Sequence, residues 1–333
     1  MEPFKLRPSQ ARRIGLGAGI LGAILVALKY ALRSPTKRRV PDAISPAVFA
    51  TKVLHTSLGA VVYHEAGSGP ALVFVHDIGL GASSFEWAKV YPEFAATHRV
   101  IALDLVGFGE SERPDMNYSP TDYVRMLAEF IRAVGCEAPP VLIASGLGAG
   151  LCVLLASQHP ELVARLILHM PNGTGEPGRQ PLAWFTRLAF RTPLLARFLY
   201  RNHLSTKSAI AHWLRRAAFL DPAKVTEETI DVFTTCAQQP GAEHATLAWL
   251  GGRLTIDLEH RFQSLTQPVA LLWSSEAPGA PIAFAQHLQK LAPATSLAVF
   301  PDAGPLAALE APEAMTEALR EHLHTDIRVL KAG

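Results

Sequence analysis

The chain has 333 residues, 49% of them hydrophobic, so it is long enough for one large domain with a sizeable core and an additional segment. Its 31 Lys and Arg residues nearly balance 29 Asp and Glu residues, and this net charge of +2 argues against nucleic acid as a partner. The three cysteines are widely spaced and form no metal-binding or disulfide pattern, so we expect neither a metal nor a cofactor.

An apolar segment near the N-terminus is the first distinctive feature of the chain. Residues 14–28 carry no charge, and with the next four residues they reach the ~20 residues that a helix needs to cross a bilayer. Basic residues flank both ends of this run. We therefore expect a basic tail at 1–13, a single transmembrane helix at 14–32 and a linker at 33–50. A cleaved signal peptide is the alternative, although no clear cleavage site follows the run.

Small residues recur along this expected helix, at Gly15, Gly19, Gly22 and Ala23. Such residues let another helix approach closely, so they predict contact with other integral membrane protein subunits. The flank after the run is slightly richer in basic residues than the flank before it. By the positive-inside tendency, this places the globular domain on the cytoplasmic or equivalent side of the membrane.

Beyond the linker, short apolar runs alternate with segments of helical character. Continuous apolar strands separated by helices predict a parallel sheet covered on both faces. The alternation stops after the sixth strand, where helical segments predict an insertion over the carboxyl edge of the sheet. We expect an α/β core at 51–171 and 266–333, with a helical cap at 172–265. The expected strands are 52–55, 60–64, 71–76, 100–105, 141–145, 166–170, 269–273 and 297–300.

Several motifs follow one another in the predicted core. Asp104 to Pro114 reads Asp-x-x-Gly-x-Gly-x-Ser-x-x-Pro, residues 75–79 read Val-His-Asp-Ile-Gly, and residues 300–312 run from Phe-Pro-Asp-Ala-Gly to Glu-Ala-Pro. In this order and spacing the motifs resemble the α/β-hydrolase family. The resemblance implies a mostly parallel eight-stranded sheet with helices on both faces and a helical cap. It also implies an oxyanion loop formed by His76, Asp77, Ile78 and Leu147.

Acyl transfer on this frame needs a nucleophile, an acidic residue and a histidine, in that chain order. The resemblance places the nucleophile between the small residues Ala144 and Gly148, at Gly146. It places the acidic residue at Ala277 and the histidine at Pro305. None of these three side chains can perform the corresponding step.

Asp77 is a further departure, because it stands in the oxyanion loop where the family usually has glycine. If it points inward, its carboxylate opposes the negative charge that develops there during acyl transfer.

From these departures we predict a non-catalytic, membrane-anchored accessory or scaffolding subunit of a membrane protein complex. A second hypothesis is a binder of a lipid, isoprenoid or pigment in the former active-site pocket. A third is a hydrolase with a relocated triad of Ser145, His169 and Glu276, which requires three separate displacements.

Overall fold

A computed structural model describes residues 49–173, 190, 192–277, 280–292, 294–300 and 302–330 of the chain. Within these residues no helix is both long and apolar enough to cross a membrane. The predicted membrane helix at 14–32, with its small residues, lies outside the described residues, as do the basic tail and nearly all of the linker.

Eight strands form one sheet in the order β1-β2-β4-β3-β5-β6-β7-β8. β2 pairs antiparallel with both β1 and β4, and every other pair is parallel. The predicted α/β-hydrolase fold with a mostly parallel eight-stranded sheet is therefore confirmed. The strands are β1 (Ala50–His55), β2 (Ala60–Ala66), β3 (Ala71–Val75), β4 (Arg99–Leu103), β5 (Val141–Ser145), β6 (Arg165–His169), β7 (Val269–Ser274) and β8 (Ser296–Phe300).

The strands bury both of their faces, because alternate side chains of each strand point to opposite sides of the sheet. Val73 and Val75 of β3 belong to one apolar cluster, whereas Leu72 and Phe74 belong to the other. This alternation explains why the strands read as continuous apolar runs.

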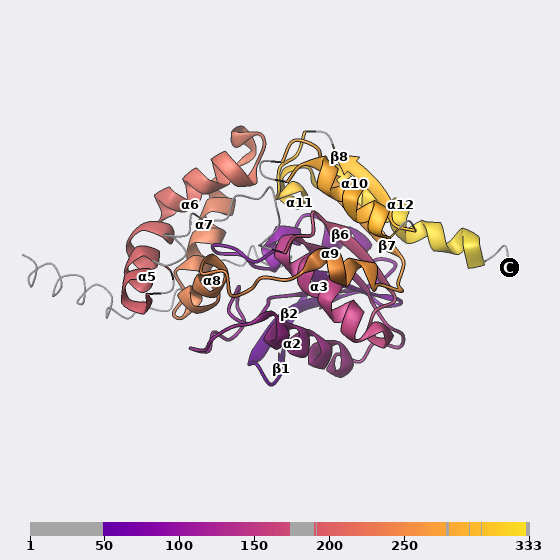
Figure 1. Cartoon of the computed structure of the whole chain (residues 1–333), viewed down its shortest axis with the longest axis horizontal. Coiled ribbons are helices and arrows are strands. Elements are labelled where there is room, and N and C mark those ends of the chain that lie inside the picture. The colour runs from indigo at the N-terminus through magenta and orange to yellow at the C-terminus, as the bar shows by residue number, and fades with distance from the viewer. Residues whose placement is uncertain are drawn as a thin grey trace, which may run out of the picture.

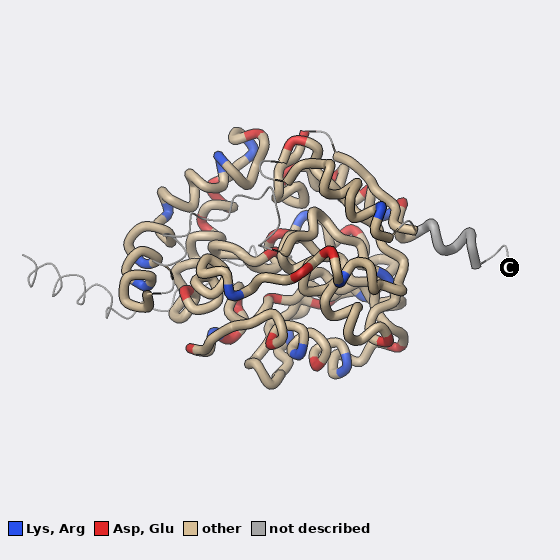
Figure 2. The backbone as a smooth tube through the Cα atoms, in the orientation of Figure 1, with Lys and Arg blue, Asp and Glu red and all other residues tan. Residues whose placement is uncertain are grey.

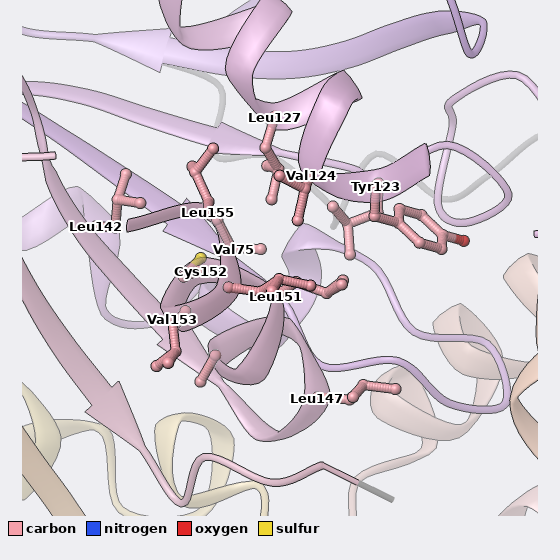
Figure 3. Packing of buried hydrophobic residues seen from close by; sticks show 14 of the residues in the cluster. Val75, Tyr123, Val124, Leu127, Leu142, Leu147, Leu151, Cys152, Val153 and Leu155 are labelled. Atoms are coloured by element: carbon pink, nitrogen blue, oxygen red, sulfur yellow. The ribbon is translucent and has the colours of Figure 1, made fainter. Parts of the chain in front are cut away.

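Helices cover the two faces of the sheet. The first face carries α2 (Pro120–Ala133), α3 (Gly146–Gln158), α9 (Leu258–Gln263) and α10 (Ile282–Leu291), and the second carries η2 (Ser84–Trp87), η3 (Tyr91–Phe94), α11 (Ala307–Glu310) and α12 (Pro312–Leu330). Figure 3 shows Leu151 and Leu155 of α3 in one cluster with Val124 and Leu127 of α2. All eleven residues from Gly146 to Ala156 of α3 are buried, so this helix is fixed on every side.

Further helices stand between β6 and β7 in the chain: α5 (Pro193–Leu199), η5 (Tyr200–Leu204), α6 (Lys207–Trp213), η6 (Leu214–Ala218), η7 (Pro222–Lys224), α7 (Glu227–Ala237) and α8 (Ala242–Leu250). Figure 1 shows α5 to α8 grouped on one side of the core. Apolar side chains of α6, η6 and α7 form a separate cluster that also includes Phe85 of η2 and Leu306 and Leu309 of the core. The expected cap range ends at residue 265 and so includes α9, which contacts α3 of the core.

In the view of Figure 2, acidic and basic residues are interspersed.

Candidate active site at the turn from β5 to α3

Gly146 lies where β5 turns into α3, and its backbone has a φ of +53°. This left-handed conformation favours glycine, because a Cβ atom costs energy there. Steric contact also excludes a side chain at residue 146. An ideal Cβ on Gly146 would lie 2.1 Å from Cγ of Asp77 and 2.2 Å from both of its carboxylate oxygens. The Asp77 carboxylate therefore occupies the position where a side chain at residue 146 would begin.

Two backbone N–H groups hold the Asp77 carboxylate. Leu147 N donates to Oδ1 at 2.6 Å, and Ile78 N donates to the same oxygen at 2.7 Å. The site also lies at the N-terminus of the 13-residue helix α3, where the helix dipole favours negative charge. These hydrogen bonds stabilise the ionised form of Asp77. The Asp77 side chain therefore points inward. The two N–H groups bind the carboxylate of Asp77 itself.

Glu86 of η2 is the second acidic residue at this turn. Its side chain is only 3% exposed, and its Oε2 accepts a hydrogen bond from Asp77 N at 2.8 Å. Burial, followed by repulsion from Asp77, raises the pKa of Glu86 to about 8, and the nearby Ser145 hydroxyl opposes part of this rise. Burial and repulsion from Asp77 thus both favour the neutral form of Glu86. The sequence contains no pattern that singles out Glu86.

Glu86 is expected to make the folded state less stable as pH rises. Its pKa is about 8 in the folded protein against an ordinary value of 4.5, so between these values the folded state binds more protons than the unfolded state. The free energy of unfolding then falls with pH in this window by up to about 1.4 kcal/mol per unit and levels off above it. Urea unfolding of the wild type and of Glu86→Gln between about pH 5 and 8 measures the difference. A difference that stays constant with pH would contradict this expectation.

His76 holds the loop that carries Asp77. Leu105 N donates to Nε2 of His76 at 3.0 Å, so the proton is on Nδ1, which donates to Asp77 O at 2.6 Å. The ring is fully buried, and burial lowers the pKa of His76. Both ring nitrogens are thus engaged with the backbone. His76 positions the loop and is not available as a base.

The relocated triad of Ser145, His169 and Glu276 is not assembled. Ser145 and His169 are register partners on β5 and β6, but no hydrogen bond joins them. His169 Nε2 lies 3.2 Å from Oγ of Ser274, and burial lowers the pKa of His169 to about 3. Ser145 Oγ is buried without a hydrogen bond of good geometry, and Glu276 is exposed to solvent. No hydrogen bond joins Ser145, His169 and Glu276, because each side chain lies in a different local environment.

The other two expected triad positions lie on loops that follow β7 and β8. Ala277 is buried, and Pro305 is partly exposed. Beside Pro305, an ideal Cβ on Gly304 would lie 2.7 Å from Ala218 O, and Leu306 N donates to the same oxygen at 3.0 Å. The chain between β6 and β7 thus lies directly on the loop where the family resemblance expects a histidine.

One group of side chains among the described residues brings potential metal ligands together. The ligand atoms of His64, Asp104 and Glu110 lie within 4.8 Å of one another. The two oxygens of Asp104 already accept backbone N–H bonds, from Ser84 at 2.6 Å and from Glu110 at 2.7 Å. Asp104 therefore has a clear structural role, which is to hold the loop after β4 against η2.

Residues 72–318 match the Alpha/beta hydrolase family, and the chain belongs to this family. Among curated relatives, it is 35% identical over 107 residues to a 2-hydroxy-6-oxo-6-(2'-aminophenyl)hexa-2,4-dienoic acid hydrolase of Metapseudomonas resinovorans, covering 32% of this chain and 37% of that protein. It is also 35% identical over 127 residues to a haloalkane dehalogenase of Mesorhizobium japonicum, covering 38% of this chain and 39% of that protein. The alignments thus span about two fifths of these relatives.

A solved structure supports the fold over a longer range. A serine hydrolase involved in carbazole degradation superposes with a TM-score of 0.69 and 23% identity, covering 83% of this chain and 98% of that protein.

The prediction of a non-catalytic scaffolding protein, and with it of a pseudoenzyme, is contradicted by these relatives, which are named as hydrolases and a dehalogenase. The prediction rested on the three expected triad positions and treated Asp77 only as an obstacle to acyl transfer. It did not consider that this carboxylate stands at the empty nucleophile position. A carboxylate can itself act as a nucleophile or a base, so the lack of a serine does not imply a lack of chemistry.

Proposed function

We propose that this protein is a hydrolase whose reaction takes place at the turn from β5 to α3. The observation that carries the proposal is the convergence of Ile78 N and Leu147 N on one oxygen atom, at 2.7 and 2.6 Å. Two fixed N–H groups, one in the loop after β3 and one at the N-terminus of α3, stabilise negative charge on an oxygen without having to reorganise during the reaction. Membership of the α/β-hydrolase family and the names of the relatives support the same reaction class.

The acidic pair gives this turn its reactive groups. Asp77 is partly exposed, while Glu86 is buried, and burial together with repulsion from Asp77 raises the pKa of Glu86 to about 8. A group whose pKa lies close to the operating pH is well suited to proton transfer. We refer to Asp77, Ile78, Glu86, Gly146 and Leu147 as the elbow site.

A substrate panel tests the proposal. The full chain, purified in mild detergent, is assayed with a p-nitrophenyl ester, a 2-hydroxy-6-oxo-dienoic acid and a haloalkane. We expect turnover of at least one class by the wild type, equal turnover by Glu276→Gln, and none by Gly146→Ala. Glu276 is exposed and lies outside the elbow site, so it controls for the loss of an unrelated carboxylate. Folded wild-type protein that turns over no class of substrate would refute the hydrolase proposal.

We further propose that residues 14–32 anchor this hydrolase to a membrane as a single-pass helix, with the globular domain on the cytoplasmic or equivalent side. The uncharged run and its basic flanks support this proposal. The full chain is expected to stay in the membrane pellet after carbonate extraction, whereas a chain lacking residues 1–32 is released. Release of both forms would contradict the anchor. Co-purification of other membrane proteins that is lost when Gly15 and Gly19 are replaced by leucine would support a helix–helix contact.

A further inference from the structure

We propose that a cleft between the loop after β4 and the helices α5 and α8 binds a small carboxylate that has an apolar body. The cleft has a volume of about 260 Å³ and is lined by residues of this loop, of α5, of α8 and of the turn after α8. We call it the α5–α8 cleft. None of its described lining residues belongs to the elbow site, so the proposal goes beyond the proposed function and does not depend on it.

Two arginine side chains give the cleft an excess of positive charge. Arg197 of α5 and Arg253 after α8 line it, and among the described lining residues Asp115 is the one acidic side chain. Oδ2 of Asp115 accepts a hydrogen bond from Arg197 at 3.0 Å, and Oδ1 lies 3.1 Å from Nδ1 of His244. The Arg253 side chain, in contrast, has no hydrogen bond or ion pair with any residue that the structure describes. One arginine of the cleft is therefore available to a ligand.

The two arginines have enough donors to bind a carboxylate without breaking the contact with Asp115. A guanidinium carries five N–H donors, and the bond from Nη2 of Arg197 to Asp115 uses one of them. The planar fork of a guanidinium matches the two oxygens of a carboxylate. A ligand carboxylate can thus bind Arg253 and the remaining donors of Arg197. The exposed Asp115 stays in place and weakens this binding by repulsion.

Apolar side chains form another part of the cleft wall. Ala196 and Leu247 are 1% and 7% exposed and belong to one apolar cluster with Tyr200, and Met116 of the loop is partly buried. This cluster joins α5 to α8, which Figure 1 shows next to each other. An apolar cavity of about 150 Å³ is large enough for benzene. A cleft of about 260 Å³ therefore accommodates an aromatic ring together with a carboxylate.

The arginine pair and the apolar wall together determine the class of ligand. The arginines favour an anion over a neutral molecule of the same shape. The apolar wall adds affinity only when the ligand has an apolar body to bury there. Inorganic phosphate has the charge without the body, and an aryl amide has the body without the charge. An aryl carboxylate has both.

The test uses the full chain in mild detergent with 4-fluorobenzoate as the probe, and ¹⁹F NMR line broadening measures its binding. We expect 4-fluorobenzoate to bind more tightly than 4-fluorobenzamide, which has the same ring and no charge. Arg197→Gln and Arg253→Gln are each expected to weaken binding about tenfold, because each removes a charged donor. Arg132→Gln is the matched control and should leave binding unchanged. Arg132 is 51% exposed, and its ion pair with Glu161 lies outside the cleft.

Asp115→Asn provides a second test, in which affinity is gained. This variant removes the acidic side chain that repels the ligand, so we expect binding of 4-fluorobenzoate to become tighter by up to about fivefold. A variant that merely damaged the fold would bind the probe less tightly. In the wild type, 4-fluorobenzoate is also expected to raise the temperature of thermal unfolding, because it binds the folded state.

The outcomes decide the proposal without reference to catalysis. Weaker binding in both arginine variants together with tighter binding in Asp115→Asn supports it. Three results would overturn it: no binding of 4-fluorobenzoate by folded wild-type protein, undiminished binding when both arginines are replaced, or displacement of the probe by inorganic phosphate as effectively as by benzoate. None of these measurements involves turnover, so failure of the hydrolase proposal would leave the assignment of the α5–α8 cleft intact.

Discussion

Replacement of Gly146 by alanine is expected to abolish activity and to destabilise the protein by about 3 kcal/mol or more. The left-handed φ of +53° costs an alanine ~1–2 kcal/mol. The new Cβ also collides with the Asp77 carboxylate, which must leave the N–H groups of Ile78 and Leu147. Each buried N–H group left without a partner costs a further ~1–3 kcal/mol. Urea unfolding measures the stability, and the substrate panel measures the activity.

Gly135 offers a matched control for this experiment. It has a φ of +70°, and an ideal Cβ on it meets no heavy atom within 4 Å. Gly135→Ala therefore introduces backbone strain without a collision, and we expect a loss of ~1–2 kcal/mol with unchanged activity. Equal losses of stability and activity in the two variants would show that strain alone, and not the position of Asp77, explains the effect at residue 146.

Replacement of Glu310 by alanine is expected to cost on the order of 3–5 kcal/mol of stability. The Glu310 side chain is 4% exposed, and its carboxylate accepts backbone N–H bonds from Leu220 at 3.0 Å, Asp221 at 2.7 Å and Gly304 at 2.7 Å. Alanine leaves these three donors without their acceptor. The same bonds attach the segment after η6 to the loop after β8, so their loss loosens the chain between β6 and β7 from the core.

Two further variants control the Glu310 experiment. Glu310→Gln keeps one acceptor oxygen and is expected to show an intermediate loss. Glu317 lies on the exposed side of α12 with 67% of its side chain accessible, and its contact with Arg320 is 3.9 Å long. Glu317→Ala is expected to change stability by less than about 0.5 kcal/mol. A loss in Glu310→Ala no larger than in Glu317→Ala would contradict the role assigned to Glu310.

The fold could be predicted from the sequence because its determinants are local and repeated. Apolar runs such as Leu72–Val75 are buried on both faces of a parallel sheet, and this burial leaves a continuous signature. The loop from Asp104 has a signature for the same reason: both oxygens of Asp104 accept backbone N–H groups, so few substitutions preserve the loop. Its hydrogen-bond requirements are visible as a motif.

The site could be predicted only in part. The position of Gly146 at a strand-to-helix turn follows from the sequence, but the direction of Asp77 depends on Leu147, which lies 70 residues away in the chain. The contribution of Glu86 depends on burial, which is a property of the assembled fold. The prediction that catalytic function had been lost was wrong. It judged Gly146 and Asp77 separately, whereas the Asp77 carboxylate lies against Gly146 in the folded protein.

The contact between Gly146 and Asp77 also restricts how this site can change. A serine at residue 146 collides with the carboxylate as long as Asp77 is present, and a glycine at residue 77 leaves the N–H pair empty as long as residue 146 is glycine. Each single step toward the common arrangement of the family therefore passes through a damaged intermediate. Residues 77 and 146 are therefore expected to change together in evolution, because the geometry of the turn disfavours changing either one alone.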